Sequence, residues 1–274
     1  MQLNKAAGAL GAHISGVALA DIVSDESLFE NIHRALIDHQ VLFFRDQNAP
    51  AEVFQAFARR FGEIEAHPAY QTVAGAPDVQ ILESTPENPS KIEVWHSDMT
   101  FRPRPPALSL LHGQIIPAFG GDTLWASAAA AFDELSQPMK AFLEPLRALN
   151  DFRFGFKESL AAPGGEERLA STVAANPPVS HPVIRTHPIS GRKVIYVNPL
   201  FTTKIEDLSD HESREILAFL YRHIVTEEFT VRLNWSVNTV AIWDNRSTQH
   251  KPVNDFFPQH RRMHRVTIAG DQPR

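Results

Sequence analysis

The chain has 274 residues, of which 43% are hydrophobic and 21% charged, a composition that excludes collagen-like, coiled-coil and fully disordered proteins. Its 26 Lys and Arg residues and 32 Asp and Glu residues give a formal net charge of −6, which argues against nucleic acid or an anionic membrane as a partner. A small anionic substrate would therefore need local arginines. The sequence contains no cysteine, so any metal must be held by His, Asp or Glu.

The N-terminal segment lacks the charged and apolar regions of a secretory leader, and no apolar run approaches the roughly 18 residues of a membrane span. These features predict a cytoplasmic protein with no membrane partner. Single β-barrels reach this chain length, and no linker or internal repeat interrupts the sequence. We therefore expect one domain over residues 1–274.

The first third of the chain alternates between predicted strands and helices. Residues 10–21 mix small, apolar and polar residues around two glycines, which predicts two short strands joined by a turn. Apolar residues recur at helical spacing over residues 27–39 and 54–61, and residues 41–44 form a compact apolar run between them. This pattern predicts two amphipathic helices that flank a buried strand.

The middle third predicts strands near residues 79–82 and 107–115, a helical stretch over residues 127–150 and a strand over residues 151–156. Residues 157–180 then show no sustained period and are bounded by Pro-rich and Gly-rich sequence. A long irregular insert in a compact domain is commonly a lid or a disordered loop. We expect a mobile lid there.

The last third predicts a strand at residues 194–197 and a helix that starts at the capping box Ser209 to Glu212. It also predicts strands over residues 229–235, 239–243 and 265–268, where residues alternate or are apolar. Many short strands with a few helices indicate an all-β core, a sandwich or barrel, decorated by helices.

Among the 13 histidines, pattern must select the candidate metal ligands, and the chain has only one His-x-Asp tripeptide, His96-Ser97-Asp98. In a strand, residues two apart share a face, so His96 and Asp98 would sit in chelating position. Trp95, Met99 and Phe101 surround the pair with apolar groups, where an unpaired carboxylate would be costly unless a cation compensated it. On its own, however, the tripeptide is more often without function.

His250 is the strongest candidate for a third ligand, because among the histidines it alone has arginines both eleven and fifteen residues later, Arg261 and Arg265. Two His and one carboxylate suit non-haem Fe(II) and leave positions open for co-substrate and dioxygen. Arg265 alternates with Val266, so we expect it to point into the barrel. The alternative is that Arg261-Arg262 forms a solvated basic turn.

Several motifs in order make the whole chain resemble the taurine/aryloxyalkanoate (TauD/TfdA-type) dioxygenases, which use Fe(II) and 2-oxoglutarate. The motifs are Leu10-Gly11-Ala12, Trp95-His96-Ser97-Asp98, Gly120-Gly121-Asp122-Thr123-Leu124-Trp125, Trp243-Asp244-Asn245-Arg246 with Thr248-Gln249-His250, and residues 261–265. The resemblance implies a double-stranded β-helix, the cupin-like jelly roll, with a metal in its core.

Carried over to this chain, the resemblance makes His96, Asp98 and His250 the iron ligands. It makes Thr123 and Arg261 the groups that hold the distal carboxylate of 2-oxoglutarate. Dioxygen is the other co-substrate.

The resemblance assigns the anionic head of the prime substrate to Arg265, and the substrate pocket to His67 and Tyr70 in the sequence His-Pro-Ala-Tyr. Phe156 and Phe201 are expected to pack the substrate, and the segment 157–180 to respond to it.

Two residues depart from the pattern of taurine enzymes. Ile92 stands where they carry an Asn close to the substrate amine, and Gly155 stands where a Ser precedes the pocket Phe. A buried ammonium without partners is penalised, so an apolar sulfonate or an alkyl sulfate ester would fit Ile92 better than taurine.

The main hypothesis is an enzyme that hydroxylates the carbon next to the anionic head of taurine or a related alkyl sulfonate, releasing sulfite, succinate and CO2. Alternatives in the same family are an alkylsulfatase and an aryloxyalkanoate dioxygenase. A non-redox metal-dependent hydrolase or isomerase, or a silent jelly-roll binding protein, remain further alternatives. As in other family members, a homodimer or homotetramer is expected.

Overall fold

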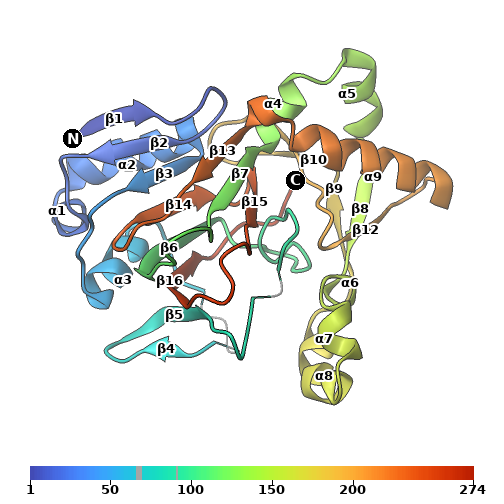
Figure 1. Cartoon of the computed structure of the whole chain (residues 1–274). Helices are drawn as coiled ribbons and strands as arrows, with labels where there is room; N and C mark the ends of the chain where they lie inside the picture. Colours follow the sequence, from blue (N-terminus) through green and yellow to red (C-terminus); the bar gives the residue numbers. More distant parts are fainter. Residues whose placement is uncertain (66–69, 91) are drawn as a thin grey trace.

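The computed structural model describes residues 1–65, 70–90 and 92–274. Its largest sheet has the strand order β1-β2-β3-β14-β6-β16-β5-β4 (Figure 1). In that order the strands span Gln2–Lys5, Ala12–Ser15, Val41–Phe44, Val240–Asp244, Leu108–Ile115, Arg261–Ile268, Ala76–Ser84 and Thr72–Val73. Neighbouring strands are antiparallel except for the parallel pair β2 and β3.

A second sheet contains β13 (Thr230–Leu233), β7 (Thr123–Ser127) and β15 (Thr248–Pro252) in that order. Its apolar side chains, including Trp125 and Leu233, share one buried cluster with side chains of the large sheet such as Phe43, Trp243 and Met263. The two sheets therefore face each other across a common core, as the jelly-roll prediction requires.

The other face of the large sheet is covered by α1 (Leu19–Ser24), α2 (Glu26–His39) and α3 (Ala51–Arg59). Successive side chains of a strand point to opposite faces of the sheet, so the large sheet contributes to one apolar cluster under the helices and to another between the two sheets. In β14, Ile242 packs with the helices, whereas its neighbours Ala241 and Trp243 pack between the sheets. The same division separates Leu42 from Phe43 in β3.

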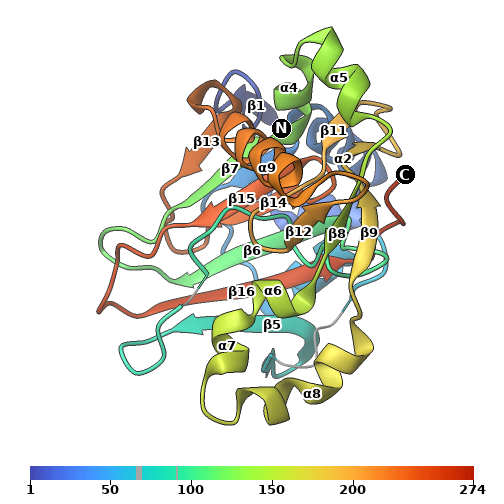
Figure 2. The ribbon, with the colours of Figure 1, turned by 90° about the vertical axis from the view of Figure 1, so that its right-hand side faces the viewer.

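Most of the remaining elements lie to the right of the jelly roll in Figure 1 and therefore in front of it in Figure 2. They include a sheet β12-β8-β9, a hairpin β10-β11 and three helices that share a further apolar cluster. These elements are β8 (Arg147–Asn150), β9 (Val179–Pro182), β10 (Ile184–Thr186), β11 (Lys193–Ile195), β12 (Thr202–Ile205), α4 (Ala128–Asp133), α5 (Gln137–Leu143) and α9 (Asp210–Ile224), with a 3-10 turn at Glu227–Phe229. Helix α9 begins at the predicted capping box, in which the Ser209 side chain accepts a hydrogen bond from the Glu212 N–H.

An arm of short helices, α6 (Phe152–Gly155), α7 (Lys157–Ala161) and α8 (Gly165–Ala175), extends beyond the sheets in Figure 1. The strand predicted over residues 151–156 is therefore wrong, since Asp151 caps the start of α6 by accepting from the Arg153 N–H. The irregular structure predicted for 157–180 is also wrong, because most of that segment is helical. That the arm acts as a lid stays a prediction.

Two further predictions need correction. The stretch 127–150 is not one helical run but contains two short helices, α4 and α5, and strand β8. A turn follows α4, and α5 then begins with Ser136 as its N-cap and Pro138 in its first turn. Of the two strands expected in 10–21, only β2 exists. It pairs with β1, and α1 begins at Leu19. Within the described residues, no helix is long and apolar enough to cross a membrane.

Candidate metal centre and adjoining cavity

His96 and His250 lie side by side because their backbones pair across two segments far apart in the sequence. The His96 N–H donates to the His250 carbonyl at 3.0 Å, and the His250 N–H donates back at 2.7 Å. Strand β15 carries His250, whereas His96 makes only an isolated bridge and Asp98 follows in a turn. The premise that His96 and Asp98 share a continuous strand is therefore wrong, although the chelating arrangement exists.

Three ligand atoms meet at one point between the sheets. Asp98 Oδ1 lies 3.7 Å from His96 Nε2 and 3.9 Å from His250 Nε2. All three residues are buried, and they form the cluster of potential metal ligands found within the described residues. With ligand bonds of about 2.0–2.2 Å, as at His and carboxylate sites, one ion fits between them.

Hydrogen bonds outside the triad leave its ligand atoms free to bind a metal. His96 Nδ1–H donates to the Val94 carbonyl at 2.9 Å, which leaves the lone pair on Nε2. Ser109 Oγ donates to Asp98 Oδ2 at 2.7 Å, which leaves Oδ1. Second contacts of this kind orient the ligands of established metal sites. The donor set therefore fits a divalent ion.

Electrostatics keep the triad in its ligating form. Burial, with His96 nearby, lowers the pKa of His250 to about 3, and burial also lowers the pKa of His96. Both imidazoles are neutral near pH 7. Burial alone would raise the pKa of Asp98, but the surrounding His250, Arg265 and His96 outweigh it and hold that pKa at about 2. The site thus presents two neutral nitrogens and one carboxylate.

The triad lies in a cavity of about 590 Å³, a volume ordinary for a small-molecule site. The cavity also reaches Thr123, Arg261 and Arg265. Strands β7 and β16 supply these residues, so the structure brings together the metal ligands and the two arginines predicted beside them. Among the remaining predicted positions, Tyr70 and Ile92 also line the cavity.

Arg261 has an unsatisfied group at the cavity. Its Nε is buried and has no hydrogen-bond partner among the described residues. Burial lowers the pKa of Arg261 to about 10, against the opposing effect of Asp122, so the guanidinium stays charged near pH 7. Thr123 lies beside it on β7, where its Oγ1 accepts from Trp235 Nε1 at 3.0 Å. The alternative of a solvated basic turn is wrong for Arg261.

Arg265 is held at one side of its guanidinium. Its Nε donates to Gln80 Oε1 at 3.1 Å, across the paired strands β16 and β5, and the guanidinium carbon lies 4.9 Å from the centre of the Tyr70 ring. Arg265 lines the cavity, and its two terminal guanidinium nitrogens take no part in the hydrogen bond to Gln80. They are suited to a bidentate anion such as a carboxylate, sulfonate or sulfate.

Two predicted pocket residues lie elsewhere, and one is outside the described residues. Phe156 and Phe201 pack with Phe101 and Phe152 in a separate aromatic cluster and are not among the side chains that line the cavity. Gly155 has a packing reason, because a Cβ there would lie 2.5 Å from the Phe201 ring. His67 lies outside the described residues.

Three polar residues that hold the site, Ser109, Gln80 and Asn245, have no role in the sequence-based prediction, where Asn245 occurs only within a motif. The Ser109 and Gln80 side chains are buried within short apolar runs, Leu108-Ser109-Leu110-Leu111 in β6 and Val79-Gln80-Ile81-Leu82 in β5. A buried polar group needs a partner, so an isolated Ser or Gln in such a run is a signal that could have indicated them. Asn245 contacts Asp98 through its amide.

A jelly roll that holds two histidines and one carboxylate around open space is the arrangement of non-haem Fe(II) oxygenases. Comparison with known proteins agrees: the model of the "Taurine catabolism dioxygenase TauD, TfdA family" matches residues 2–267. The chain belongs to this family.

Individual relatives extend over nearly the whole chain. An "Alkylsulfatase" from Acinetobacter baylyi is 37% identical over 99% of this chain and 86% of its own length. An "Alpha-ketoglutarate-dependent sulfate ester dioxygenase" from Pseudomonas putida is 36% identical over 100% and 91%. A crystal structure of a taurine dioxygenase from Burkholderia xenovorans superposes with a TM-score of 0.85, at 34% identity, over 99% of this chain and 90% of that one. This chain is a 2-oxoglutarate-dependent dioxygenase, with Fe(II), 2-oxoglutarate and O2 as its cofactor and co-substrates.

Proposed function

We propose that the enzyme oxidises a small organosulfur anion with an apolar tail, an alkyl sulfate ester or an alkyl sulfonate, in preference to taurine. The observation that carries this proposal is Ile92, which lines the cavity where a taurine enzyme would need a polar partner for the substrate ammonium. The relatives named for sulfate esters and alkyl sulfates support the same substrate class.

In this proposal Thr123 and Arg261 hold the distal carboxylate of 2-oxoglutarate. The unpartnered Nε of Arg261 supports this role, because a buried guanidinium donor loses its solvation and gains it back only from an acceptor. A carboxylate is the acceptor that a guanidinium matches best.

Arg265 receives the sulfate or sulfonate group. The hydrogen bond from its Nε to Gln80 orients the guanidinium and leaves the other nitrogens for the substrate. A lysine would provide the charge without the planar, two-point match. Arg265 and the metal triad line the same cavity, so this contact would place the first carbon of the substrate near the metal, as near-contact reaction geometry requires.

Four apolar side chains of the cavity, Ile81, Leu82, Ile92 and Leu111, would pack the substrate tail, and polar residues such as Asn88 and Ser90 line the cavity as well. Glu83 also lines the cavity, but its Oε1 already accepts from His260 at 2.6 Å and from Arg262 at 2.9 Å. This oxygen is thus already shared between two donors. An alkyl chain would gain from burial against these four side chains at about 25 cal/mol per Å² of apolar surface, whereas an ammonium beside Ile92 would lose hydration without finding an acceptor on that side chain.

Fe(II) with 2-oxoglutarate and O2 supplies an oxidation in which one oxygen atom enters the co-substrate, giving succinate and CO2, and the other enters a substrate C–H bond. The carbon hydroxylated is the one next to the head group that Arg265 holds. A hydroxylated sulfate ester then breaks its C–O bond to give an aldehyde and sulfate. A hydroxylated sulfonate breaks its C–S bond to give an aldehyde and sulfite.

A substrate panel tests the proposal. Octyl sulfate, octanesulfonate, taurine and phenoxyacetate would each be supplied to the enzyme with Fe(II), 2-oxoglutarate and air. The rate of succinate formation at varied substrate concentration gives kcat/KM for each compound. We expect the two octyl compounds to exceed taurine by at least about tenfold, equivalent to roughly 1.4 kcal/mol. Taurine or phenoxyacetate as the best substrate would refute the proposal.

A further inference from the structure

The side chain of Asn245 brackets the backbone of Asp98. It is fully buried, and its Oδ1 accepts from the Asp98 N–H at 2.7 Å. Its Nδ2 donates to the Asp98 carbonyl at 3.1 Å and to the Pro106 carbonyl at 2.9 Å. The Asn245 amide therefore holds both the N–H and the carbonyl of Asp98, a metal ligand that lies 147 positions away in the sequence.

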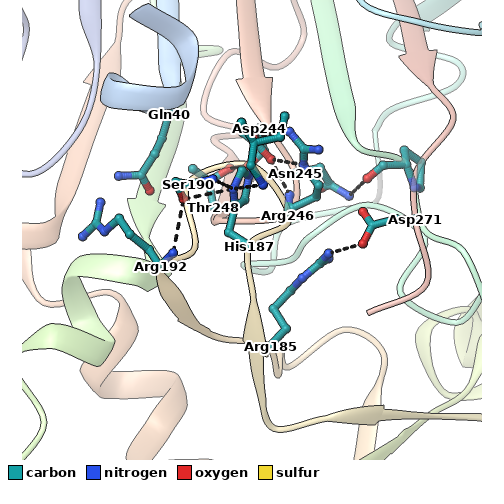
Figure 3. Close-up of polar contacts among 12 residues, drawn as sticks. Gln40, Arg185, His187, Ser190, Arg192, Asp244, Asn245, Arg246, Thr248 and Asp271 are labelled. Carbon is teal, nitrogen blue, oxygen red and sulfur yellow. Dashed lines mark hydrogen bonds and ion pairs between the residues drawn. The ribbon is translucent and has the colours of Figure 1, made fainter. Parts of the chain in front are cut away.

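The turn that presents Asn245 is itself built from buried charges (Figure 3). Asp244 binds Arg246 through both carboxylate oxygens, at 2.9 and 2.6 Å, and also accepts from the Arg246 N–H at 3.0 Å. His187 Nε2 lies 2.9 Å from the same carboxylate. Bidentate pairs of this kind add geometric specificity, so the backbone between Asp244 and Arg246, where Asn245 sits, has little freedom.

This turn joins β14 to β15, and β15 carries His250. The same hairpin thus supplies one metal ligand directly and anchors another through Asn245. Asp98 needs such an anchor because it lies in a turn, and Met99 directly after it has a left-handed backbone with a φ of 50°. A non-glycine residue in that region costs free energy and is retained where its surroundings impose it.

We propose that Asn245 is a positioning residue for the metal centre, which sets the orientation of the Asp98 carboxylate relative to His250. Asn245 is neither one of the metal ligands nor a cavity-lining residue, so its effect on the metal passes through Asp98. The inference depends on the metal triad and not on which organosulfur compound is oxidised.

Substitution Asn245→Asp isolates this role because it keeps the shape and the acceptor but removes the NH2 group. The new oxygen would face the carbonyls of Asp98 and Pro106 at about the former bond lengths, which turns two attractions into repulsions. Outer contacts that orient metal ligands typically change metal affinity by about 10–100-fold.

Gln47 offers a matched control in another part of the fold. Its Oε1 accepts from the Leu19 N–H at 2.9 Å, and its Nε2 donates to the carbonyls of Val17 at 3.2 Å and Arg45 at 2.9 Å. It is also buried and does not line the cavity. Gln47→Glu therefore makes the same chemical change to the same kinds of bonds without reaching the metal site.

The experiment measures Mn(II) affinity from the free-ion EPR signal and the visible spectrum of the Co(II)-loaded protein, for wild type, Asn245→Asp and Gln47→Glu. Each protein is held below its own thermal midpoint. We expect Asn245→Asp to weaken Mn(II) binding about 10–100-fold and to alter the Co(II) bands. We expect Gln47→Glu to change neither the affinity nor the bands, even if its Tm falls as far as that of Asn245→Asp.

Affinity and Co(II) bands of Asn245→Asp equal to those of wild type would overturn the inference. So would an equal loss in both variants, since that would reflect general destabilisation. If Asn245→Asp does not fold, the smaller neutral variant Asn245→Ser replaces it. Failure of both to fold while Gln47→Glu folds would assign Asn245 to the fold and not to the ligand. A wild-type protein that binds no Mn(II) would instead contradict the triad itself.

Discussion

Two arginines four residues apart on β16, Arg261 and Arg265, line the cavity. Arg261 and Arg265 lie on the same side of the strand because residues two and four apart share a face. The sequence offers His96 and Asp98 as candidate ligands through the tripeptide and selects His250 by the two arginines that follow it, but only the family resemblance assigns roles to these residues. The residues that orient them cannot be predicted, because Gln80 reaches Arg265 across 185 positions and nothing local marks that pairing.

Replacing each arginine with alanine should affect the binding of one anion and not the other: 2-oxoglutarate for Arg261 and the organosulfur substrate for Arg265. Arg265→Ala should raise the KM for the organosulfur substrate by about 10–100-fold, since a hydrogen bond to a charged group contributes about 1.5–3 kcal/mol. Its KM for 2-oxoglutarate should change little, and Arg261→Ala should show the opposite split. Steady-state succinate kinetics with each substrate varied in turn measures both. An unchanged organosulfur KM in Arg265→Ala would move the head group elsewhere.

Elements with a strong period are predicted well and short capped elements are not. Helices α2, α3 and α9 follow from apolar spacing, and α9 also from its capping box. Helix α6 was predicted as a strand because Phe152, Phe154 and Phe156 alternate with polar or small residues, which imitates a strand's period of two. The cap at Asp151 and the aromatic packing around Phe201 decide for helix. Tertiary contacts of this kind are not visible in a local pattern.

The close approach of α6 to residues 200–201 predicts a packing defect when Gly155 gains a side chain. In Gly155→Ser the new Cβ would meet the Phe201 ring at 2.5 Å and the Leu200 carbonyl oxygen at 3.0 Å. We expect a loss of about 1–3 kcal/mol, as for overpacked cores, seen as a lower Tm in calorimetry. Gly8→Ser is the control, because a Cβ at Gly8 meets nothing within 4 Å. Equal Tm values for the two variants would contradict the packing.

At the scale of the whole molecule, the triad ties the segment before β6 to the second sheet, so metal occupancy and global stability are coupled. The pairing of these segments could be predicted only from resemblance, because 154 positions separate the histidines of the bridge (from 96 to 250). The cytoplasmic location, the single domain and the homodimer or homotetramer stay predictions.

Metal should therefore stabilise the fold. At a free Mn(II) concentration of 100 times its Kd, mass action adds about 2.7 kcal/mol, which should raise the Tm of wild type, and EDTA should reverse the change. Asp98→Ala removes the carboxylate ligand and should show no Mn(II)-dependent rise. The measurement is a thermal melt with and without metal. A rise in Asp98→Ala as large as in wild type would place the ion elsewhere.

The most direct test of the central claim is the stoichiometry of the reaction. Oxygen uptake and succinate release would be measured together for the Fe(II)-loaded enzyme with octyl sulfate. The jelly-roll triad predicts one succinate and one aldehyde for each O2 consumed, and no conversion without oxygen. Conversion of octyl sulfate under strictly anaerobic conditions, with no succinate formed, would instead establish a metal-dependent hydrolase and contradict the account.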